Sequence, residues 1–422
     1  MNVRRLALDV LSDVTDGGAY ANLRLKQAQA GLSAADARFL SALVYTTLDR
    51  LLYLDYILSA FAPGRQKRTV RALLRLGACE LLCLRTPPHA AVSEYVSLCK
   101  QLGKGAAAGF VNAVLRRIDR ERDALPPLPD APDARLSIEY SYPLWLVRLW
   151  CAERGEAEAR QLLAAAPRPL SVRAQYPETT EGVLAALPCG ATRGRMDENC
   201  LYLDAGMDVT ADPLFQAGRL AVQGEGAMLA CRALGDCRGR RVLDACAAPG
   251  GKSAYIASLS ENQAALTCFE LHAHRLSLLQ STLERLHVRA DLRQRDASVH
   301  DPAFDGAFDA VLVDAPCSGL GLLSGKPDLR YRKQPADIGT LAQIQARILD
   351  ACAPYVRPGG TLVYATCTVS AAENERQTAA FFSRHPEFSP APLPFHDGHE
   401  LQLLPHRHGT EGFYLARMQR CT

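Results

Sequence analysis

Two cysteines stand at the ends of predicted strands, in surroundings that suit nucleophilic chemistry. Cys317 closes Asp314-Ala-Pro-Cys317, and Cys367 lies between a predicted strand and a predicted helix, where the helix N-terminus favours a thiolate. Methylating an unactivated pyrimidine carbon needs a soft nucleophile for C6, an acid near N3 and a base for the C5 proton. Two cysteines and an aspartate supply that set. Any one cysteine is more often a buried hydrophobic residue, and the residues alone do not decide which of the two attacks.

A glycine turn precedes both cysteines in the chain. Arg241-Val-Leu-Asp-Ala-Cys-Ala-Ala-Pro-Gly-Gly-Lys252 is typical of a short strand that ends at Asp244, a tight turn and a helix that opens at Lys252. Glycines let a ligand approach the backbone, and the first amides of a helix are unpaired donors. The segment has neither the dinucleotide fingerprint nor the phosphate loop, and an ordinary strand–turn–helix corner is the alternative. Because no basic residue precedes Lys252 in the loop, we expect a zwitterionic or cationic ligand.

Acidic residues end the strands that neighbour this turn. The first predicted strand ends at Asp244, the second at Glu270, the third at Asp296 and the fourth at Asp314. The carboxyl ends of parallel strands meet at one edge of a sheet, where ligands bind, and an acid about 20 residues past a glycine turn can accept both ribose hydroxyls. A single acid could be a helix N-cap, but the series indicates a nucleoside-bearing cofactor beside a reactive centre.

The alternation of strands and helices from about residue 220 predicts the scaffold for these residues. Short apolar runs indicate strands at 241–245, 265–269, 291–295, 308–313 and 361–366, and helical patterns separate them at 252–259, 272–286, 337–353 and 371–384. Continuous apolar strands between helices favour a parallel, doubly wound sheet that is covered on both faces. We therefore expect an α/β domain.

The first part of the chain has helical periodicity and a basic charge. Residues 4 to about 122 carry apolar stripes at helical spacing, namely Leu40, Leu43, Val44 and Leu48; Val70, Leu73, Leu74 and Leu81; and Phe110, Val114, Leu115 and Ile118. Residues 1–124 hold 18 lysines and arginines against 11 acidic residues, and the remainder holds 30 against 34. Basic rows that could bind RNA phosphates are Arg68, Arg71 and Arg75, and Arg116 and Arg117. Solvated helix faces are the alternative reading of this charge.

Length and composition suggest the domain organisation. A chain of 422 residues is expected to form two or three domains. We predict an all-helical domain at 1–123, a proline-rich linker at 124–137, a small α+β element at 138–220 and the α/β domain at 221–422. No apolar run is long enough for a membrane span. The 14 scattered cysteines have no C-x-x-C pair and no metal-ligand spacing, which favours reduced thiols, a cytoplasmic protein and no metal. We expect a monomer.

The helical part resembles a known RNA-binding domain. The residues that carry the resemblance are Asp36-Ala-Arg-Phe-Leu40, Leu43-Val-Tyr-Thr-Thr-Leu48, Leu74-Arg-Leu-Gly-Ala-Cys-Glu-Leu-Leu82 and Gly109-Phe-Val-Asn-Ala-Val-Leu-Arg116. They are similar to the NusB-type domain, in the version that is fused to bacterial ribosomal RNA methyltransferases. The resemblance implies that the basic faces bind RNA.

The residues with candidate chemistry resemble the RNA cytosine-C5 methyltransferase family. The matching segments are Asp244–Ser253, Asp314–Gly319, Lys326–Asp328 and Thr366–Asn374, and Leu403–Pro405 with Gly412–Ala416 resemble the closing strand pair. With the NusB-like front, the whole chain is similar to the Sun/RsmB type. That resemblance implies a Rossmann-like class I methyltransferase domain, a small RNA-recognition subdomain at 138–220, and transfer of a methyl group to C5 of cytosine 967 in 16S ribosomal RNA.

The resemblance also implies roles for individual residues. Cys367 would be the nucleophile and Cys317 the base or release residue, with Asp314 and Lys252 in the reactive centre. S-adenosylmethionine would be held by Cys246, Ala247, Ala248, Pro249, Gly250, Gly251, Lys252, Glu270, Asp296 and Asp314. We expect the Gly250 and Gly251 amides to receive the methionine carboxylate, with the sulfonium facing Asp314. Lys252 could order Asp314, or it could be an ordinary lysine at a helix start.

Three positions depart from the family pattern, and two other functions stay open. Gln175 stands where Asn is usual, Gly224 where Asp is common, and Glu270 where Asp is frequent. The first alternative is an RNA-binding or ribosome-assembly factor of NusB type without activity. The second is the same enzyme acting on transfer RNA or on another ribosomal site. Methylation of an exocyclic amino group is disfavoured, because Cys317 stands where an aromatic stacking residue would be needed.

Overall fold

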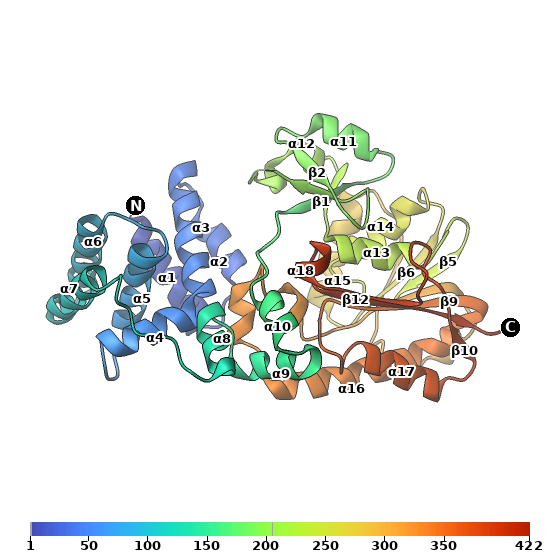
Figure 1. Ribbon diagram of the computed structural model, residues 1–422. Coiled ribbons are helices and arrows are strands. Elements are labelled where there is room, and N and C mark those ends of the chain that lie inside the picture. Colours follow the sequence, from blue (N-terminus) through green and yellow to red (C-terminus); the bar gives the residue numbers. More distant parts are fainter. Residues whose placement is uncertain (1, 205) are drawn as a thin grey trace. The chain divides into compact units, whose positions relative to one another are not determined.

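The structure is a computed structural model that describes residues 2–204 and 206–422. It divides into two compact units (Figure 1). Unit 1 comprises Met1–Ala164 with Lys326–Lys333, and unit 2 comprises Ala165–Gly325 with Gln334–Thr422.

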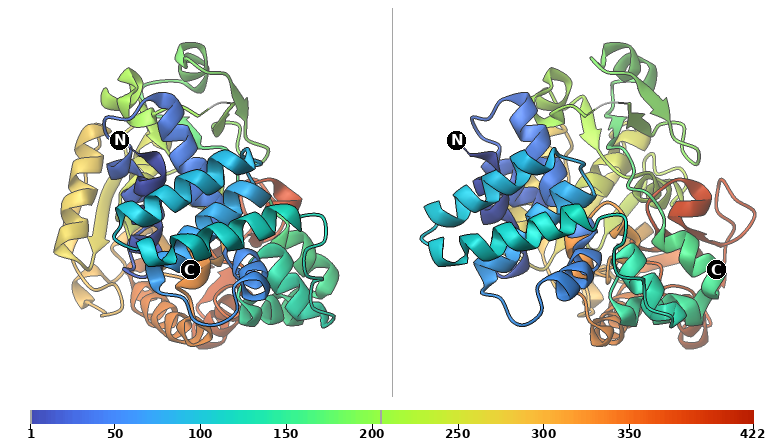
Figure 2. Two further views of the ribbon diagram at one scale, coloured as in Figure 1. Left: turned by 90° about the vertical axis from the view of Figure 1, so that its left-hand side faces the viewer. Right: turned by 60° about the vertical axis from the view of Figure 1, so that its left-hand side comes forward.

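Unit 1 is all-helical, as the periodicity of the first 122 residues predicts (Figure 2). Its helices are α1 (Val3–Thr15), α2 (Ala21–Ala28), α3 (Ala34–Asp49), α4 (Leu51–Phe61), α5 (Arg68–Leu82), α6 (Pro88–Gln101), α7 (Gly105–Arg120), α8 (Pro132–Tyr140), α9 (Leu144–Arg154) and α10 (Glu156–Leu163). The side chain of Ser33 accepts the amide of Asp36 at 3.2 Å and so satisfies one of the free donors at the start of α3.

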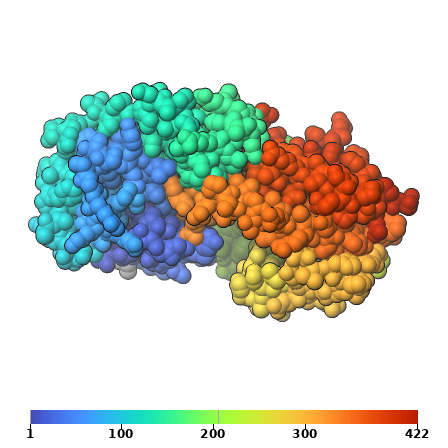
Figure 3. All heavy atoms as spheres, turned by 90° about the horizontal axis from the view of Figure 1, so that it is seen from below, coloured from blue at the N-terminus to red at the C-terminus, as the bar shows by residue number. Residues whose placement is uncertain are grey.

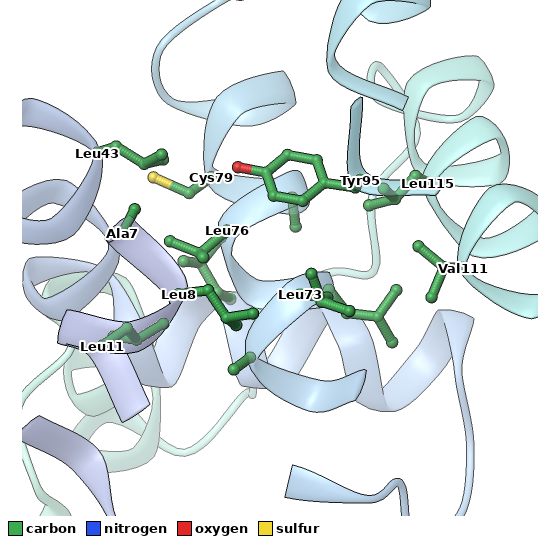
Figure 4. Close-up of a cluster of buried hydrophobic side chains, with 14 of the residues drawn as sticks. Ala7, Leu8, Leu11, Leu43, Leu73, Leu76, Cys79, Tyr95, Val111 and Leu115 are labelled. Atoms are coloured by element: carbon green, nitrogen blue, oxygen red, sulfur yellow. The ribbon is translucent and has the colours of Figure 1, made fainter. Parts of the chain in front are cut away.

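The predicted apolar stripes form the core of unit 1. Leu43, Leu73 and Leu115 are fully buried, and Figure 4 shows them around Tyr95 with side chains from α1 and α5. Helices α5 and α7 approach closely at Gly77, where a Cβ atom would lie 2.7 Å from the side chain of Leu115. A glycine at this position therefore fits the packing of the two helices.

The stripe predicted on α7 is wrong at one residue. Phe110 is 41 % exposed, whereas Val111 is fully buried. The buried stripe of α7 consists of Ala108, Val111, Val114, Leu115 and Ile118, whose helical spacing places them on one face of the helix.

A short segment of the expected α/β domain packs within unit 1. In Lys326–Lys333, the guanidinium of Arg330 donates to the carboxylate of Asp49 at 2.7 Å, and the side chain of Arg330 is only 3 % exposed. The hydroxyl of Tyr331 donates to the carbonyl of Leu48 at 2.9 Å. These contacts join residues that are more than 280 positions apart in the chain, so local sequence patterns do not reveal them.

The predicted linker and domain boundaries differ from the structure. Helix α8 begins at Pro132, inside the segment 124–137 that the prolines mark as a linker. Proline is compatible with the first turn of a helix because its missing N–H has no partner there in any case. Helices α8 to α10 extend unit 1 to Ala164, beyond the boundary predicted at residue 123.

Unit 2 begins with a small antiparallel sheet of four strands in the order β2-β3-β1-β4. Its elements are β1 (Ser171–Ala174), α11 (Thr180–Ala186), β2 (Ala191–Arg193), β3 (Leu201–Leu203), α12 (Pro213–Gln216) and β4 (Leu220–Val222). Strands β1 and β3 lie within the small α+β element expected at 138–220. Val172, Leu201 and Leu220 are fully buried in the core of this sheet.

Two departures from the family pattern have structural explanations. Gln175 is fully buried; its side-chain oxygen accepts from Arg173 at 2.6 Å, and its amide donates to the carbonyl of Ala254 at 3.3 Å. Gln175 thereby links the small sheet to the helix after the glycine turn. Gly224 leaves room for the carboxylate of Glu411, which a Cβ atom at position 224 would strike.

The main sheet of unit 2 has eight strands, with β10-β12-β9-β8-β5-β6-β7 in order and β11 paired to β12. The elements are α13 (Glu225–Arg232), β5 (Arg241–Asp244), α14 (Gly251–Leu259), β6 (Ala265–Glu270), α15 (Ala273–Arg285), β7 (Asp291–Gln294), β8 (Phe308–Asp314), α16 (Pro335–Cys352), β9 (Val356–Thr366), α17 (Glu375–Arg384), β10 (Phe388–Pro390), β11 (Glu400–Leu403), α18 (Pro405–His408) and β12 (Phe413–Arg420).

The five predicted strands form the parallel part of this sheet, and the remainder is antiparallel. Strands β5 to β9 pair in parallel, whereas β12 pairs antiparallel with β9, β10 and β11. The sheet is therefore mixed and not wholly parallel as its first five strands suggest. Two boundaries also differ, since β9 starts at Val356 and α17 starts at Glu375.

Helices cover both faces of the sheet because successive strand residues point to opposite sides. Leu243 and Val311 belong to the core that includes residues of α16 and α17, and Figure 3 looks onto the face of unit 2 that these two helices cover. Val242 and Leu312 belong to the core with α13, α14 and α15. The strand order reverses between β5 and β8, and ligands of such sheets bind beyond that point.

Candidate active site

A cavity of about 310 Å³ lies at the carboxyl ends of β5, β6, β8 and β9. The predicted site residues that line it are Cys246, Ala248, Lys252, Glu270, Asp296, Asp314, Cys317 and Cys367. An adjoining hollow of about 170 Å³ is lined by Asp244 and by Ala247, Pro249 and Gly251 of the glycine turn. The structure therefore gathers both cysteines and the predicted cofactor residues other than Gly250 into one region.

The two cysteines lie side by side, with their Sγ atoms 3.3 Å apart. Cys317 is in the loop after β8 and Cys367 directly follows β9, the parallel neighbour of β8. The pKa of Cys317 is raised well above its usual value, first by the hydrogen bond to Cys367 and then by burial. Cys317 therefore keeps its proton and can donate it towards Cys367, an arrangement that favours Cys367 as the thiolate.

Lys252 and Asp314 form an ion pair beside the cysteines. The ammonium of Lys252 donates to Oδ2 of Asp314 at 2.6 Å. Burial by itself would lower the pKa of Lys252, but Asp314 raises it above its usual value, and Cys367 adds to the increase. Lys252 thus stays positively charged and favours negative charge on the Cys367 sulfur. Of the two roles considered for Lys252, this geometry matches the ordering of Asp314.

The glycine turn holds a buried carboxylate with one unpartnered oxygen. Asp244 is 1 % exposed, and its Oδ2 accepts from the hydroxyl of Ser253 at 2.6 Å. Its Oδ1 has no hydrogen-bond partner within the described residues, and burial raises the pKa of Asp244 to about 6. Gly250 has a φ of +108° and precedes α14. A Cβ atom there would lie 3.0 Å from Leu279, so this position requires glycine.

The acids at the next strand ends differ in their surroundings. Glu270 is 4 % exposed, and Arg275 lies 3.7 Å from its Oε2 atom. Arg275 also donates to the carbonyl of Ala248 at 2.9 Å, so it connects the glycine turn to this carboxylate. Asp296 is exposed, and hydrogen bonds from Ser298 lower its pKa. Asp296 therefore stays ionised at neutral pH and can accept hydrogen bonds.

Comparison with known proteins identifies the family. Residues 232–419 match the family described as "16S rRNA methyltransferase RsmB/F", and residues 1–120 match the NusB family. A Bacillus subtilis protein named "Probable ribosomal RNA small subunit methyltransferase B" is 37 % identical, over 99 % of each chain. Ribosomal RNA small subunit methyltransferase B of Xylella fastidiosa is 36 % identical, over 98 % of this chain and 99 % of its own. This chain belongs to the RsmB/F family.

Solved structures share the fold of this RsmB/F member. The crystal structure of PH0851 has a TM-score of 0.82 at 23 % sequence identity, and the match covers 98 % of this chain and 97 % of that chain. A methyltransferase homologue from Pyrococcus horikoshii has a TM-score of 0.59 at 24 % identity and covers 69 % of this chain and 100 % of its own. The expected NusB-like helical part and Rossmann-like methyltransferase part are therefore confirmed.

The protein is a methyltransferase of the S-adenosylmethionine-dependent kind, and its residues fit that cofactor. Glu270 is the buried acid that can accept ribose hydroxyls. The Gly250 amide, expected to receive a carboxylate, already donates to the carbonyl of Ala247 at 2.8 Å. The amide of Gly251, at the start of α14, can receive a carboxylate. The unpartnered oxygen of Asp244 suits a cationic ammonium, since burial of this carboxylate without a partner is costly.

The structure places two of the predicted RNA-binding arginines in internal ion pairs. Arg71 and Arg75 both donate to Oδ2 of Asp55 at 2.7 Å. Burial would raise the pKa of Asp55, but the two arginines outweigh it and lower the pKa. Arg68 is exposed at the start of α5. The row on α5 is therefore not three equivalent phosphate ligands.

The second basic row has partners on its own helix. Arg117 donates to Glu121 at 3.2 Å, and its guanidinium lies 4.8 Å from the ring centre of Phe61. Arg116 donates to the side chain of Asn112 at 3.0 Å. Exposed pairs of this kind contribute little and can be exchanged for a phosphate.

Sequence reasoning missed a cluster of fully buried polar side chains beside the cysteine loops. Its members are Gln345, Glu373 and Asn374. The available signal was the Glu-Asn pair in the segment Thr366–Asn374, because polar residues directly after a candidate nucleophile can serve to hold it. Sequence reasoning also missed Arg275 and Arg295, which line the cavity.

The described residues contain no long apolar helix and no cluster of potential metal ligands. No helix in 2–204 or 206–422 is both long and apolar enough to cross a bilayer. Within the same ranges, no group of three or more His, Cys, Asp or Glu side chains is placed to hold a metal ion.

Proposed function

We propose that this protein transfers a methyl group to C5 of a cytosine in 16S ribosomal RNA, at position 967, through a covalent bond between Cys367 and C6 of the base. The observation that carries the proposal is the pair of sulfur atoms 3.3 Å apart, beside the Lys252–Asp314 ion pair and in one cavity. The names of the relatives support a ribosomal RNA substrate.

The first step uses the charge arrangement around Cys367. The thiolate of Cys367 forms a bond to C6, and the C5–C6 electron pair moves so that C5 becomes nucleophilic. The negative charge that develops on the ring near N3 meets the ammonium of Lys252, which its ion pair with Asp314 holds in place. C5 then accepts the methyl group, which S-adenosylmethionine supplies.

The second step uses Cys317. Its raised pKa depends first on the hydrogen bond to Cys367, and the negative sulfur that favours this bond disappears once Cys367 is bonded to carbon. The pKa of Cys317 should then fall, so that Cys317 releases its proton to solvent and, as a thiolate, can take the C5 proton. The C5–H electron pair restores the C5–C6 double bond and expels the Cys367 thiolate, which completes the exchange of a proton for a methyl group.

The NusB-like part is proposed to hold the RNA while unit 2 acts on it. The excess of basic residues over 1–124 favours a polyanion. We also propose that the protein acts as a monomer, because a single chain supplies both cysteines, the Lys252–Asp314 pair and Glu270 to the cavity.

The test is methyl transfer from labelled S-adenosylmethionine to unmodified 16S ribosomal RNA, followed by mapping of the modified base. We expect labelled 5-methylcytosine at position 967. Cys317→Ala should accumulate a covalent protein–RNA adduct, because the final proton is not removed, and Cys367→Ala should form none. If labelled 5-methylcytosine is found in transfer RNA or at another ribosomal site, that RNA and not cytosine 967 of 16S ribosomal RNA is the substrate. No labelled base in any RNA would leave a binding or assembly role, and the reverse adduct pattern would exchange the roles of the cysteines.

A further inference from the structure

A buried cluster of polar side chains forms hydrogen bonds with the residues next to the two cysteines. Glu373 and Asn374 lie between the end of β9 and the start of α17. Both are fully buried, although a buried carboxylate is costly unless it is well hydrogen-bonded. The partners of these two residues explain why they are there.

Glu373 binds the loop that carries Cys317. Its Oε1 accepts the backbone N–H of Ser318 at 2.8 Å, and its Oε2 accepts the hydroxyl of the same residue. Gln345 of α16 donates both to Oε1 of Glu373 and to the carbonyl of Pro316, each at 3.0 Å. The residues immediately before and after Cys317 are thus fixed by the same small network.

The same network binds the residues on both sides of Cys367. The hydroxyl of Thr366 donates to the side-chain oxygen of Asn374 at 2.6 Å, and the amide of Asn374 donates to the carbonyl of Thr368 at 3.1 Å. The hydroxyl of Thr368 lies 2.7 Å from that of Ser318 and 3.4 Å from Oε2 of Glu373. The two cysteine loops are therefore joined through these hydroxyls and one carboxylate.

We propose that Glu373 and Asn374 are positioning residues. Together with Gln345 they form hydrogen bonds around each cysteine and so set the distance between the two sulfur atoms. This inference rests on the cysteine roles given under Proposed function. Neither side chain lines the cavity, so both act through the loops. A buried network of hydrogen bonds makes the groups that it joins more rigid, and a reacting group displaced by about 1 Å can lose about 10²-fold in rate.

The test compares two variants that separate the charge of Glu373 from its shape. Glu373→Ala removes both oxygen acceptors. Glu373→Gln keeps one oxygen for the Ser318 amide, and its NH₂ group can donate to the hydroxyls of Ser318 and Thr368. The matched control is Glu375→Gln. Glu375 is two residues after Glu373, and its Oε2 atom has no hydrogen-bond partner among the described residues.

Two measurements are made on each full-length variant. The first is the rate of Cys317–Cys367 disulfide formation with diamide, which accepts the two protons and two electrons, read from the linked peptides. The second is the single-turnover rate of methyl transfer to 16S ribosomal RNA, with the dissociation constant of S-adenosylmethionine. For Glu373→Ala we expect slower cross-linking and a loss of about 10²-fold in turnover, with cofactor affinity unchanged. Glu373→Gln should lie nearer to wild type, and Glu375→Gln should match it.

Several outcomes would overturn the inference. One is wild-type cross-linking and turnover in Glu373→Ala. Another is equal loss of turnover in Glu373→Gln and Glu373→Ala with wild-type cross-linking in both, since charge and not position would then matter. Should Glu373→Ala not fold, Ser318→Ala and Thr368→Val remove the hydroxyls and keep the buried carboxylate, and wild-type behaviour of both would overturn the inference. If the wild-type protein makes no 5-methylcytosine, the proposed function fails. The cross-linking comparison still tests whether Glu373 positions the two cysteines.

Discussion

Replacing Asp244 with asparagine should remove a pH-dependent loss of stability from unit 2. Asp244 is 1 % exposed, its Oδ1 has no partner among the described residues, and burial raises its pKa from 3.8 to about 6. Asparagine has nearly the same shape and can still accept the hydroxyl of Ser253. It carries no charge at any pH, so burial costs it less than it costs an ionised carboxylate.

The sign follows from the protons that each state binds. Between pH 3.8 and about 6 the folded protein holds a proton on Asp244 that the unfolded chain has released. The free energy of unfolding must therefore fall as the pH rises through this window. The gap corresponds to about 3 kcal/mol, at about 1.4 kcal/mol per pH unit. The contribution of the neutral side chain is complete below pH 3.8 and is lost above the folded-state pKa.

Hydrogen exchange of the β5 and β8 amides measures the opening free energy of this part of the sheet. The difference between Asp244→Asn and wild type should grow by about 3 kcal/mol from pH 3.5 to 6.5. Ser253→Ala provides a second test: because the Ser253 hydrogen bond lowers the pKa of Asp244, its removal should shift the window to higher pH. A difference between variant and wild type that is the same at all pH values would refute the reasoning.

Three further predictions concern unit 1, whose unfolding can be followed by fluorescence because both tryptophans lie there. Glu80→Ala should cost about 3 kcal/mol in urea unfolding, because Glu80 is fully buried and pairs with Arg4 at 2.8 Å; a loss below 1 kcal/mol would contradict a structural ion pair. Gly77→Ala should cost about 2 kcal/mol in the same assay, because its Cβ atom would lie 2.7 Å from Leu115, and an unchanged midpoint would show that this packing relaxes freely. Arg68→Ala should weaken RNA binding and reduce the slope of log affinity against log salt by about one, and an unchanged slope would exclude Arg68 from the RNA surface.

Much of the α/β fold could be predicted because its signals are local. Continuous apolar runs separated by helical patterns depend only on neighbouring residues, and they located β5 to β9 and the helices between them. Antiparallel pairing of β12 with β9 could not be predicted in this way, because nothing in an isolated strand records its partner or direction. The early start of β9 at Val356 was missed because it includes Pro358 and Gly359, which are rare inside strands.

The cofactor turn and the strand-end acids could also be predicted, since a parallel sheet brings the carboxyl ends of its strands to one edge whatever the side chains are. The partners of charged residues could not. The sequence predicts Arg71 and Arg75 as phosphate ligands, but in the folded protein both arginines form hydrogen bonds with Asp55. The sequence predicts Lys326–Lys333 as part of the α/β domain, but in the structure Arg330 and Tyr331 of this segment pack in unit 1.

The sequence by itself determined the chemistry that is available to this protein: two cysteines, an aspartate and a lysine at the ends of predicted strands. Only the tertiary structure decided how these groups act on one another. The 3.3 Å contact between Cys317 and Cys367 joins residues 50 positions apart, and the hydrogen bond from the Ser318 amide to Glu373 joins residues 55 positions apart. Hydrogen bonds and pKa changes depend on distances of a few ångströms. Such distances are set by the packing of the whole sheet and not by any local pattern of residues.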